Sequence, residues 1–324
     1  MRAVRCHELT GPKNLRVDEV PAPTAGPGEV KIDVRAAALN FPDVLLTYGK
    51  YQFKAEPPFV PGGEGAGVVS AIGPGVTDLA VGDRVAFTIM NGAFAEQVIA
   101  PAPAVVKLPG AVTFEVGAAT LLTYATTLHA LVDRAALKSG ETLLVLGAAG
   151  GVGTAALELG KLMGARVIAA ASSDDKVAYC KDRGADEGIN YVREDLKDRA
   201  KVLTQGNGAN VVYDPVGGAY ADAALRAIAW EGRYLVVGFA AGDIPKIPLN
   251  LVLLKGCQIV GVFWGSFAMR EPQKNRANAE RILAWVAEGK LRPHVDTVIK
   301  FDEARSAFER MERRDVKGKL VLVP

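Results

Sequence analysis

Cysteine is scarce in this chain, and the three that occur, Cys6, Cys180 and Cys257, lie far apart. Such spacing argues against a disulfide framework and suits a reducing compartment. An excess of charge of one sign is also missing, because 38 basic and 36 acidic residues leave a formal net charge of +2. So weak a field gives no reason to expect nucleic acid or an anionic membrane surface as a partner.

Long apolar runs are absent as well. No stretch approaches the roughly 20 apolar residues that a membrane-spanning helix needs, and residues 1–15 contain no apolar core of a secretory signal. We therefore expect a soluble, cytoplasmic protein with no membrane and no nucleic acid among its partners.

Proline marks the first third of the chain, where 12 of the 18 prolines fall within residues 1–110. Between them lie short alternating runs such as VKIDVRAAAL (30–39) and GDRVAF (82–87). This texture is typical of short strands joined by turns, so it predicts a β-rich module. A chain of 324 residues is about twice a typical domain, so a second domain is expected after it.

From about residue 110 on, apolar runs alternate with stretches of helical periodicity, and the helices are predicted at GTAALELGKLMG (153–164) and YADAALRAIAW (220–230). The runs predicted as strands are TLLVLG (142–147), RVIAAA (166–171), EGIN (187–190), NVVYD (210–214), GRYLVVG (232–238) and QIVGVF (258–263). Strands that are apolar along most of their length predict a parallel sheet covered by helices on both faces, as in the doubly wound dinucleotide fold. Two helices, about 272–288 and 302–312, and a last strand, KLVLV (319–323), complete an expected α/β protein.

A glycine-rich turn follows the strand predicted at 142–147. Against the pattern G-x-G-x-x-G the sequence offers Ala148, Gly150 and Gly153, with alanine in place of the first glycine. Small residues are needed there because the backbone must approach a pyrophosphate and the next helix must pack closely on the sheet. The N–H groups of that helix's first turn then face the phosphates. The sequence therefore predicts a nicotinamide dinucleotide held by Ala148, Gly150, Gly151, Val152 and Gly153.

The residues about twenty positions later indicate which dinucleotide is bound. NAD-preferring sites usually place an acid there for the ribose 2′-hydroxyl, whereas this chain has Ser172 and Ser173, followed by Lys176. Hydroxyls and a cation suit a 2′-phosphate, so NADPH is favoured. The alternative is that Asp174 or Asp175 takes the role of the acid, although their place in the next helix's first turn favours a capping role.

With this turn in place, the sequence resembles the zinc-independent quinone oxidoreductases (zeta-crystallin-like) of the medium-chain dehydrogenase/reductase superfamily. The resemblance covers nearly the whole chain and rests on AAALNFPDVLLTYGKY (36–51), PFVPGGEGAGVVSAIGPGVTDLAVGDRV (58–85), GAFAEQ (92–97), AATLLTYATTLHAL (118–131), GAAGGVG (147–153), GADEGINY (184–191) and VVYDPVGG (211–218). It implies a GroES-like catalytic domain over residues 1–124, a Rossmann NADPH-binding domain over 125–263, and a return to the catalytic domain over 264–324. It also implies an active site in the cleft between the domains.

Where zinc-dependent relatives have metal ligands, this chain has other residues. Catalytic zinc needs three protein ligands, but the first ligand, a cysteine, is replaced by Asn40, and the histidine of the GHE motif is replaced by Gly63. The four-cysteine structural zinc lobe is absent too, because no cysteine lies between Cys6 and Cys180. We therefore expect no metal in the reaction.

The resemblance assigns further residues to the site. It implies that Asn40, Tyr51 and Thr126 lie beside the nicotinamide and the substrate. It implies that cofactor contacts also come from Tyr191, which meets the 2′-phosphate, and from Phe239, Val262, Phe263, Trp264 and Arg314. Simpler roles stay open at this point: Asn40 satisfying backbone groups at a strand end, Thr126 capping a helix, and Asp214 structuring the turn before PVGG.

Without metal, the protein has to hold the cofactor's hydride against an electron-poor acceptor in a dry cleft. A quinone suits such a site, since its oxygens can accept hydrogen bonds from Tyr51 or Asn40. The same cofactor placement serves reduction of an activated alkene, an enoyl thioester or an α,β-unsaturated ketone. A third alternative is a non-catalytic NADPH-binding protein, as crystallins of this family are. The apolar run QIVGVF at a sheet edge favours a homodimer.

Overall fold

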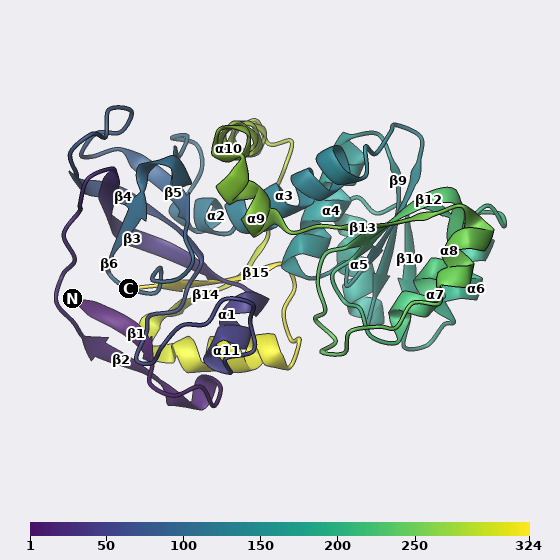
Figure 1. Cartoon of the computed structure of the whole chain (residues 1–324), viewed down its shortest axis with the longest axis horizontal. Coiled ribbons are helices and arrows are strands. Elements are labelled where there is room, and N and C mark those ends of the chain that lie inside the picture. The colour runs from purple at the N-terminus through teal and green to yellow at the C-terminus, as the bar shows by residue number, and fades with distance from the viewer. The chain divides into compact units, whose positions relative to one another are not determined.

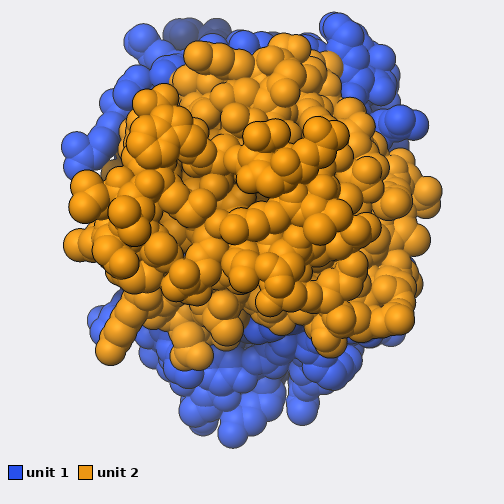
Figure 2. All heavy atoms as spheres, turned by 90° about the vertical axis from the view of Figure 1, so that its right-hand side faces the viewer, with its two compact units in different colours: residues 1–122, 268–324 blue, residues 123–267 orange.

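The computed structural model describes all residues from 1 to 324. The chain forms two compact units, coloured separately in Figure 2: unit 1 comprises residues 1–122 and 268–324, and unit 2 comprises residues 123–267. None of the helices combines the length and the apolar character that crossing a bilayer requires.

Unit 1 is rich in strands, as the proline-punctuated texture predicts. Seven of its strands form one sheet in the order β14-β15-β3-β4-β5-β7, with β6 paired to β3, and β1 pairs with β2 separately. The strands are β1 (Arg2–Cys6), β2 (Leu15–Glu19), β3 (Glu29–Leu39), β4 (Glu64–Ile72), β5 (Arg84–Thr88), β6 (Gln97–Pro101), β7 (Val105–Lys107), β14 (Val295–Lys300) and β15 (Lys319–Val323). The helices of this unit are α1 (Phe41–Thr47), α2 (Phe114–Ala118), α10 (Pro272–Ala287) and α11 (Ala304–Glu312).

The long strand β3 organises the core of unit 1 because its side chains contribute to two apolar clusters. Val30, Ile32 and Val34 belong to one cluster. The register with β4 shifts between Val34 and Ala36, and Ala36 and Ala38 belong to the other cluster. At its end β3 pairs antiparallel with both β4 and β15. Residues from three distant parts of the chain therefore meet where β3 ends.

Unit 2 confirms the predicted parallel sheet. Six strands in the order β10-β9-β8-β11-β12-β13 are parallel throughout, which is the strand order of the dinucleotide-binding fold. The strands are β8 (Thr142–Leu146), β9 (Arg166–Ala171), β10 (Glu187–Asn190), β11 (Ala209–Asp214), β12 (Ile228–Val236) and β13 (Gln258–Gly261). The helices that accompany them in Figure 1 are α4 (Gly151–Leu162), α5 (Asp174–Asp182), α6 (Leu196–Leu203), α7 (Tyr220–Arg226) and α8 (Leu249–Lys255).

The helix predicted over 220–230 is wrong beyond Arg226. The chain leaves α7 there, and Ile228 begins β12 by pairing with Ala209 of β11. The register then shifts before Arg233 pairs with Val211. An alanine-rich segment has high helix propensity, but sheet pairing in the core outweighs such a local preference. The sequence also failed to indicate β14 and the short helices α8 and α9 (Trp264–Arg270).

Candidate functional site

The glycine turn after β8 leaves helix α4 open at its amino end. Gly147 takes a positive φ of 56°, and α4 begins at Gly151 with Gly150 as its N-cap and no side-chain capping bond. A Cβ at Gly153 would lie 2.3 Å from the carbonyl oxygen of Gly147, so only glycine fits where helix and turn meet. First-turn N–H groups without a cap are suited to phosphate oxygens. The predicted residues Ala148, Gly150, Gly151, Val152 and Gly153 therefore form one anion-binding turn.

A second group of predicted residues gathers at the neighbouring strand ends. β9 ends at Ala171 beside Asn190, the last residue of β10, and the Tyr191 N–H donates to the Ala171 carbonyl over 3.1 Å. Ser172 and Tyr191 therefore follow two adjacent strands, and Lys176 lies near the start of α5, which follows Ser173. The structure thus brings the hydroxyls and the cation expected for a 2′-phosphate to one corner of unit 2.

Asp174, one of the two alternative acids, already has partners for both oxygens, whereas the other, Asp175, accepts a hydrogen bond from the Ser173 hydroxyl. Its Oδ1 accepts a 2.7 Å hydrogen bond from Asn190 Nδ2, and its Oδ2 forms an ion pair with Arg193. The Asn190 bond and the Arg193 charge lower the pKa of Asp174. Sequence reasoning missed Arg193, although its position two residues after Tyr191 places it at the same strand end.

Three of the other predicted cofactor residues follow two more adjacent strands, and the remaining two lie at the start of α9 and in unit 1. Phe239 comes after β12, and Val262 and Phe263 come after β13; the Val262 N–H donates to the Val236 carbonyl over 2.9 Å, so these strand ends are neighbours. Trp264 begins α9. Arg314 belongs to unit 1, where it follows α11 with a φ of 56°.

Thr126 and Asp214 differ in whether they have the simpler role that the sequence left open. Thr126 is the sixth residue of α3 (Leu121–Leu128) and is buried, so it does not cap a helix start. Asp214 does structure the turn after β11, because its Oδ1 accepts the N–H groups of Val216 and Gly217 over 2.7 and 2.8 Å.

In unit 1, Asn40 belongs to a buried polar cluster that sequence reasoning missed. Its Nδ2 donates to Glu64 Oε1 over 2.9 Å, and its Oδ1 accepts from Lys319 Nζ. Lys319 Nζ also donates to Glu64 Oε1 over 2.7 Å. The side chains of Glu64 and Lys319 are only 1% and 5% exposed. The only signal in the sequence is a charged residue at the start of each apolar strand, in PGGE and KLVLV.

Asp43 adjoins this cluster and holds the start of α1. Its Oδ2 accepts the Asn40 N–H over 2.8 Å, and its Oδ1 accepts the Gly62 N–H over 3.2 Å. Burial raises the pKa of Asp43 to about 7, against the opposing effect of these bonds and of the Lys319 charge. Burial, aided by the charge of Asp43, also raises the pKa of the Tyr51 phenol.

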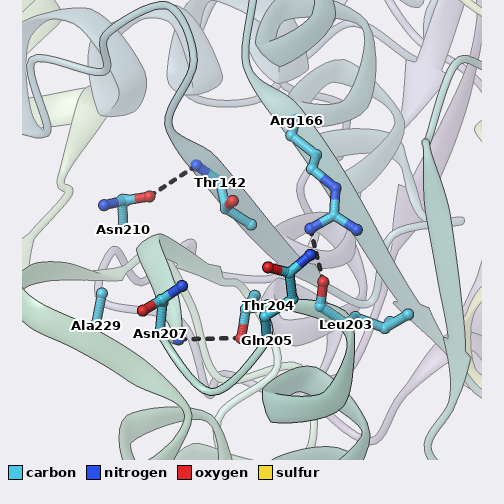
Figure 3. A pocket seen from close by; sticks show the side chains of 9 residues that line it. Thr142, Arg166, Leu203, Thr204, Gln205, Asn207, Asn210 and Ala229 are labelled. Atoms are coloured by element: carbon cyan, nitrogen blue, oxygen red, sulfur yellow. Dashed lines mark hydrogen bonds between the residues drawn. The ribbon is translucent and has the colours of Figure 1, made fainter.

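Two further observations concern a possible metal site and a hollow away from the predicted site residues. No group of three or more His, Cys, Asp or Glu side chains is placed to hold a metal ion. A polar hollow in unit 2, shown in Figure 3, lies at the amino ends of β8 and β9, opposite the glycine turn. It contains no predicted site residue, and its groups bond to one another, as Arg166 does to the Leu203 carbonyl over 2.7 Å.

Comparison with known proteins gives consistent matches over the whole chain. The alcohol dehydrogenase GroES-like domain family matches residues 26–110, which confirms the predicted GroES-like first domain, and the zinc-binding dehydrogenase family matches residues 151–284. A quinone oxidoreductase-like protein 2 homolog of Nematostella vectensis is 39% identical over 99% of the chain and 88% of its own length. A quinone oxidoreductase of Pseudomonas aeruginosa is 34% identical over 97% of both. The crystal structure of the Escherichia coli quinone oxidoreductase complexed with NADPH matches with a TM-score of 0.95 and 27% identity over 100% of both chains.

The unusual pKa of Asp43 predicts how pH affects stability. The folded protein keeps the Asp43 proton up to a pH of about 7, whereas the unfolded chain releases it near 3.8. Its contribution to the free energy of unfolding is therefore present at low pH and is lost as the pH rises through 7. Between pH 5 and pH 8 the free energy of unfolding of wild type should fall by about 2.5 kcal/mol relative to that of Asp43→Asn.

Urea unfolding of both proteins at the two pH values measures this difference. Asp33→Asn, at a partly exposed carboxylate in β3, controls for removal of an acid from the same unit. A difference between wild type and Asp43→Asn that is equal at pH 5 and pH 8 would contradict the assignment.

Proposed function

Since the chain belongs to the zinc-independent quinone oxidoreductase family of the medium-chain dehydrogenase/reductase superfamily, we propose that it is an NADPH-dependent reductase of quinones. The observation that carries this proposal is the pairing, in unit 2, of an uncapped glycine turn with a corner that holds the cations Lys176 and Arg193. The same proposal places the protein in the cytoplasm, where its three buried, unpaired thiols stay reduced.

The residues of unit 2 fit NADPH part by part. The first-turn N–H groups of α4 would bind the pyrophosphate, and no side chain competes for them. Ser172, Lys176 and Tyr191 would bind the 2′-phosphate. Arg193, whose side chain is 70% exposed, adds a second cation at that corner. Asp174 accepts a hydrogen bond from Asn190 and is paired with Arg193, so its negative charge is partly neutralised within the protein.

When bound, NADPH supplies the hydride, and the chain's own residues position the acceptor and provide for its proton. We assign Phe239, Val262, Phe263 and Trp264 to the border of the nicotinamide, and Arg314 to a contact with the cofactor. Thr126 is proposed to lie close to the ring.

Tyr51 and Asn40 are proposed to face the oxygens of the acceptor. A quinone that accepts a hydride must also gain one proton. Because burial raises the pKa of Tyr51, its phenol keeps its proton at neutral pH and can donate a hydrogen bond. Water or this phenol then supplies the proton.

The proposed activity has a direct test. Purified protein should oxidise NADPH rapidly with 1,4-benzoquinone or 1,4-naphthoquinone and more slowly with enones or enoyl-CoA thioesters, as followed by loss of absorbance at the NADPH band. Faster turnover with enones or enoyl thioesters would assign the chain to alkene reduction. NADPH binding without turnover on any acceptor would support a non-catalytic role.

The cationic corner predicts cofactor preference. Lys176→Ala and Arg193→Ala should each weaken NADPH binding by about fivefold to tenfold, because each removes a charge-assisted bond worth about 1 kcal/mol at an exposed site. NADH binding should change by less than about twofold. Asp174→Asn, which removes a competing negative charge, should tighten NADPH binding. Cofactor fluorescence titrations give all the dissociation constants.

Arg199→Ala is a matched control, since it removes a partly exposed arginine of α6 that pairs with Glu194. It should leave both affinities unchanged. Equal affinity of wild type for NADH and NADPH would overturn the 2′-phosphate assignment.

We further propose a homodimer through the β13 side of unit 2. β13 is the edge strand of the sheet, and an apolar edge invites pairing with a second chain. Trp230 in β12, Leu253 and Leu254 in α8, and Ile259 in β13 are exposed. Helix α8 packs on β12 next to β13, so these side chains gather on one side of the sheet. An apolar surface of this kind marks a protein interface.

Light scattering at micromolar concentration should give twice the chain mass of 34.1 kDa. Leu253→Glu/Leu254→Glu should lower it to one chain mass, because burying two carboxylates in an interface is unfavourable. Val202→Glu, at an exposed valine of α6, should leave the dimer intact. A wild type that is monomeric across this range would remove the proposal.

A further inference from the structure

The ion pair of Lys319 and Glu64 is buried at the point where three strands of unit 1 meet. Glu64 begins β4, Lys319 begins β15, and Asn40 follows β3. The pairing of Leu320 with Leu39 sets Lys319 beside Asn40. Removing two charges from water is costly, and an apolar pair of similar size often stabilises a fold as well. The presence of this pair therefore calls for a role beyond stability.

The pair dictates how the Asn40 amide is oriented. An ammonium group can only donate hydrogen bonds and a carboxylate can only accept them. Lys319 therefore fixes the Asn40 oxygen on one side, and Glu64 fixes the nitrogen on the other. Glu64 is held in turn, because its Oε2 accepts the Leu122 N–H over 2.9 Å. If the amide flipped, its NH2 group would face the Lys319 ammonium and its oxygen would face the Glu64 carboxylate, and neither contact is a hydrogen bond.

One hydrogen of Asn40 Nδ2 is bound more weakly than the other. The first goes to Glu64 over 2.9 Å, whereas the second has the Ala38 carbonyl at 3.3 Å, beyond the usual range for an N–H donor. The cation on Oδ1 draws electron density from the amide, which strengthens both N–H donors. Asn40 is therefore an oriented, polarised amide. One of its N–H groups is free to donate to a better-placed acceptor than the Ala38 carbonyl.

We infer that Lys319 and Glu64 are positioning residues that make Asn40 a directed hydrogen-bond donor for an oxygen of the electron acceptor. This inference rests on the proposed quinone reduction. A quinone that takes a hydride from NADPH gains two electrons, and NADPH becomes NADP⁺. Negative charge then resides on a quinone oxygen until a proton from water or Tyr51 neutralises it. A fixed donor aimed at that oxygen acts without reorganisation during the reaction.

The test removes both charges together, since Lys319→Met alone leaves an unpaired buried carboxylate. Lys319→Met/Glu64→Gln should lower kcat for 1,4-naphthoquinone by about tenfold to a hundredfold, with the Kd of NADPH unchanged within about twofold. Asn40→Ala should lower kcat by a similar factor. The triple variant should be no slower than either, because residues that act through one another are not additive. Lys319→Arg, which keeps the charge, should restore most of the rate.

A matched control separates this role from general stability. Arg233→Met/Glu141→Gln removes a largely buried ion pair of unit 2 with an N–O distance of 2.6 Å. It should lower the melting temperature comparably and leave kcat unchanged. Binding of 1,4-naphthoquinone in the absence of NADPH, followed by quenching of protein fluorescence, provides a readout that needs no turnover. It should weaken by about threefold to tenfold in Asn40→Ala and in Lys319→Met/Glu64→Gln.

The inference is overturned if Lys319→Met/Glu64→Gln keeps kcat and quinone affinity within about twofold of the Arg233→Met/Glu141→Gln control, or if the triple variant shows multiplied losses. The proposed function fails separately, by the absence of quinone turnover in wild type. In that case the binding readout still decides whether Lys319 and Glu64 act through Asn40.

Discussion

A carboxylate removed from water has to be neutralised or hydrogen-bonded. In unit 1 this requirement links strand β4 to the last strand of the chain, β15. Glu64 has no exposure to solvent, and its compensating cation, Lys319, comes from the last strand. Strand β15 has to lie beside β3 for the two to meet, so the C-terminal segment completes the first domain. The same contact fixes Asn40, the residue before α1, and Asp43 then secures that helix start through two backbone N–H groups. One buried charge pair thus sets the geometry of the whole strand junction.

The two units hold their candidate site residues in different ways. In unit 2, the groups proposed to bind the cofactor are backbone N–H groups at a helix start and side chains at the ends of parallel strands. Ser172, Tyr191 and Arg193 are placed by strand order alone, since neighbouring parallel strands end at the same edge of the sheet. In unit 1 the polar groups are buried and bonded to one another, so each is restricted to one orientation. The first arrangement suits a large, charged ligand, and the second suits a small acceptor whose charge changes during the reaction.

How well the sequence predicts a feature depends on how far apart along the chain the interacting residues lie. Five of the six parallel strands, the glycine turn and the last strand match local patterns of apolar residues and glycine, so they were predictable within a few residues. The helix predicted to reach residue 230 failed because pairing of Ile228 with β11 is a tertiary contact. Arg193 has a local signal, its position after β10, but its ion pair with Asp174 depends on two loops meeting. The Asn40–Glu64–Lys319 cluster joins positions 24 and 255 residues apart along the chain, and no pattern within one segment encodes it.

This cluster gives a physical meaning to Asn40, which the sequence resemblance matches to the first zinc ligand of the zinc-dependent enzymes. In zinc-dependent relatives a metal ion would supply a concentrated positive charge close to the reacting oxygen. Here the residue at the first ligand position, Asn40, receives the ammonium of Lys319 on its oxygen and so presents part of that charge through its amide. A covalently attached cation cannot dissociate and needs no open coordination position, but it acts through a hydrogen bond and stabilises an anion less strongly than a metal does. Such a site suits a quinone, which accepts a hydride readily, better than an alcohol or a simple ketone, whose reduction depends on strong polarisation of one oxygen.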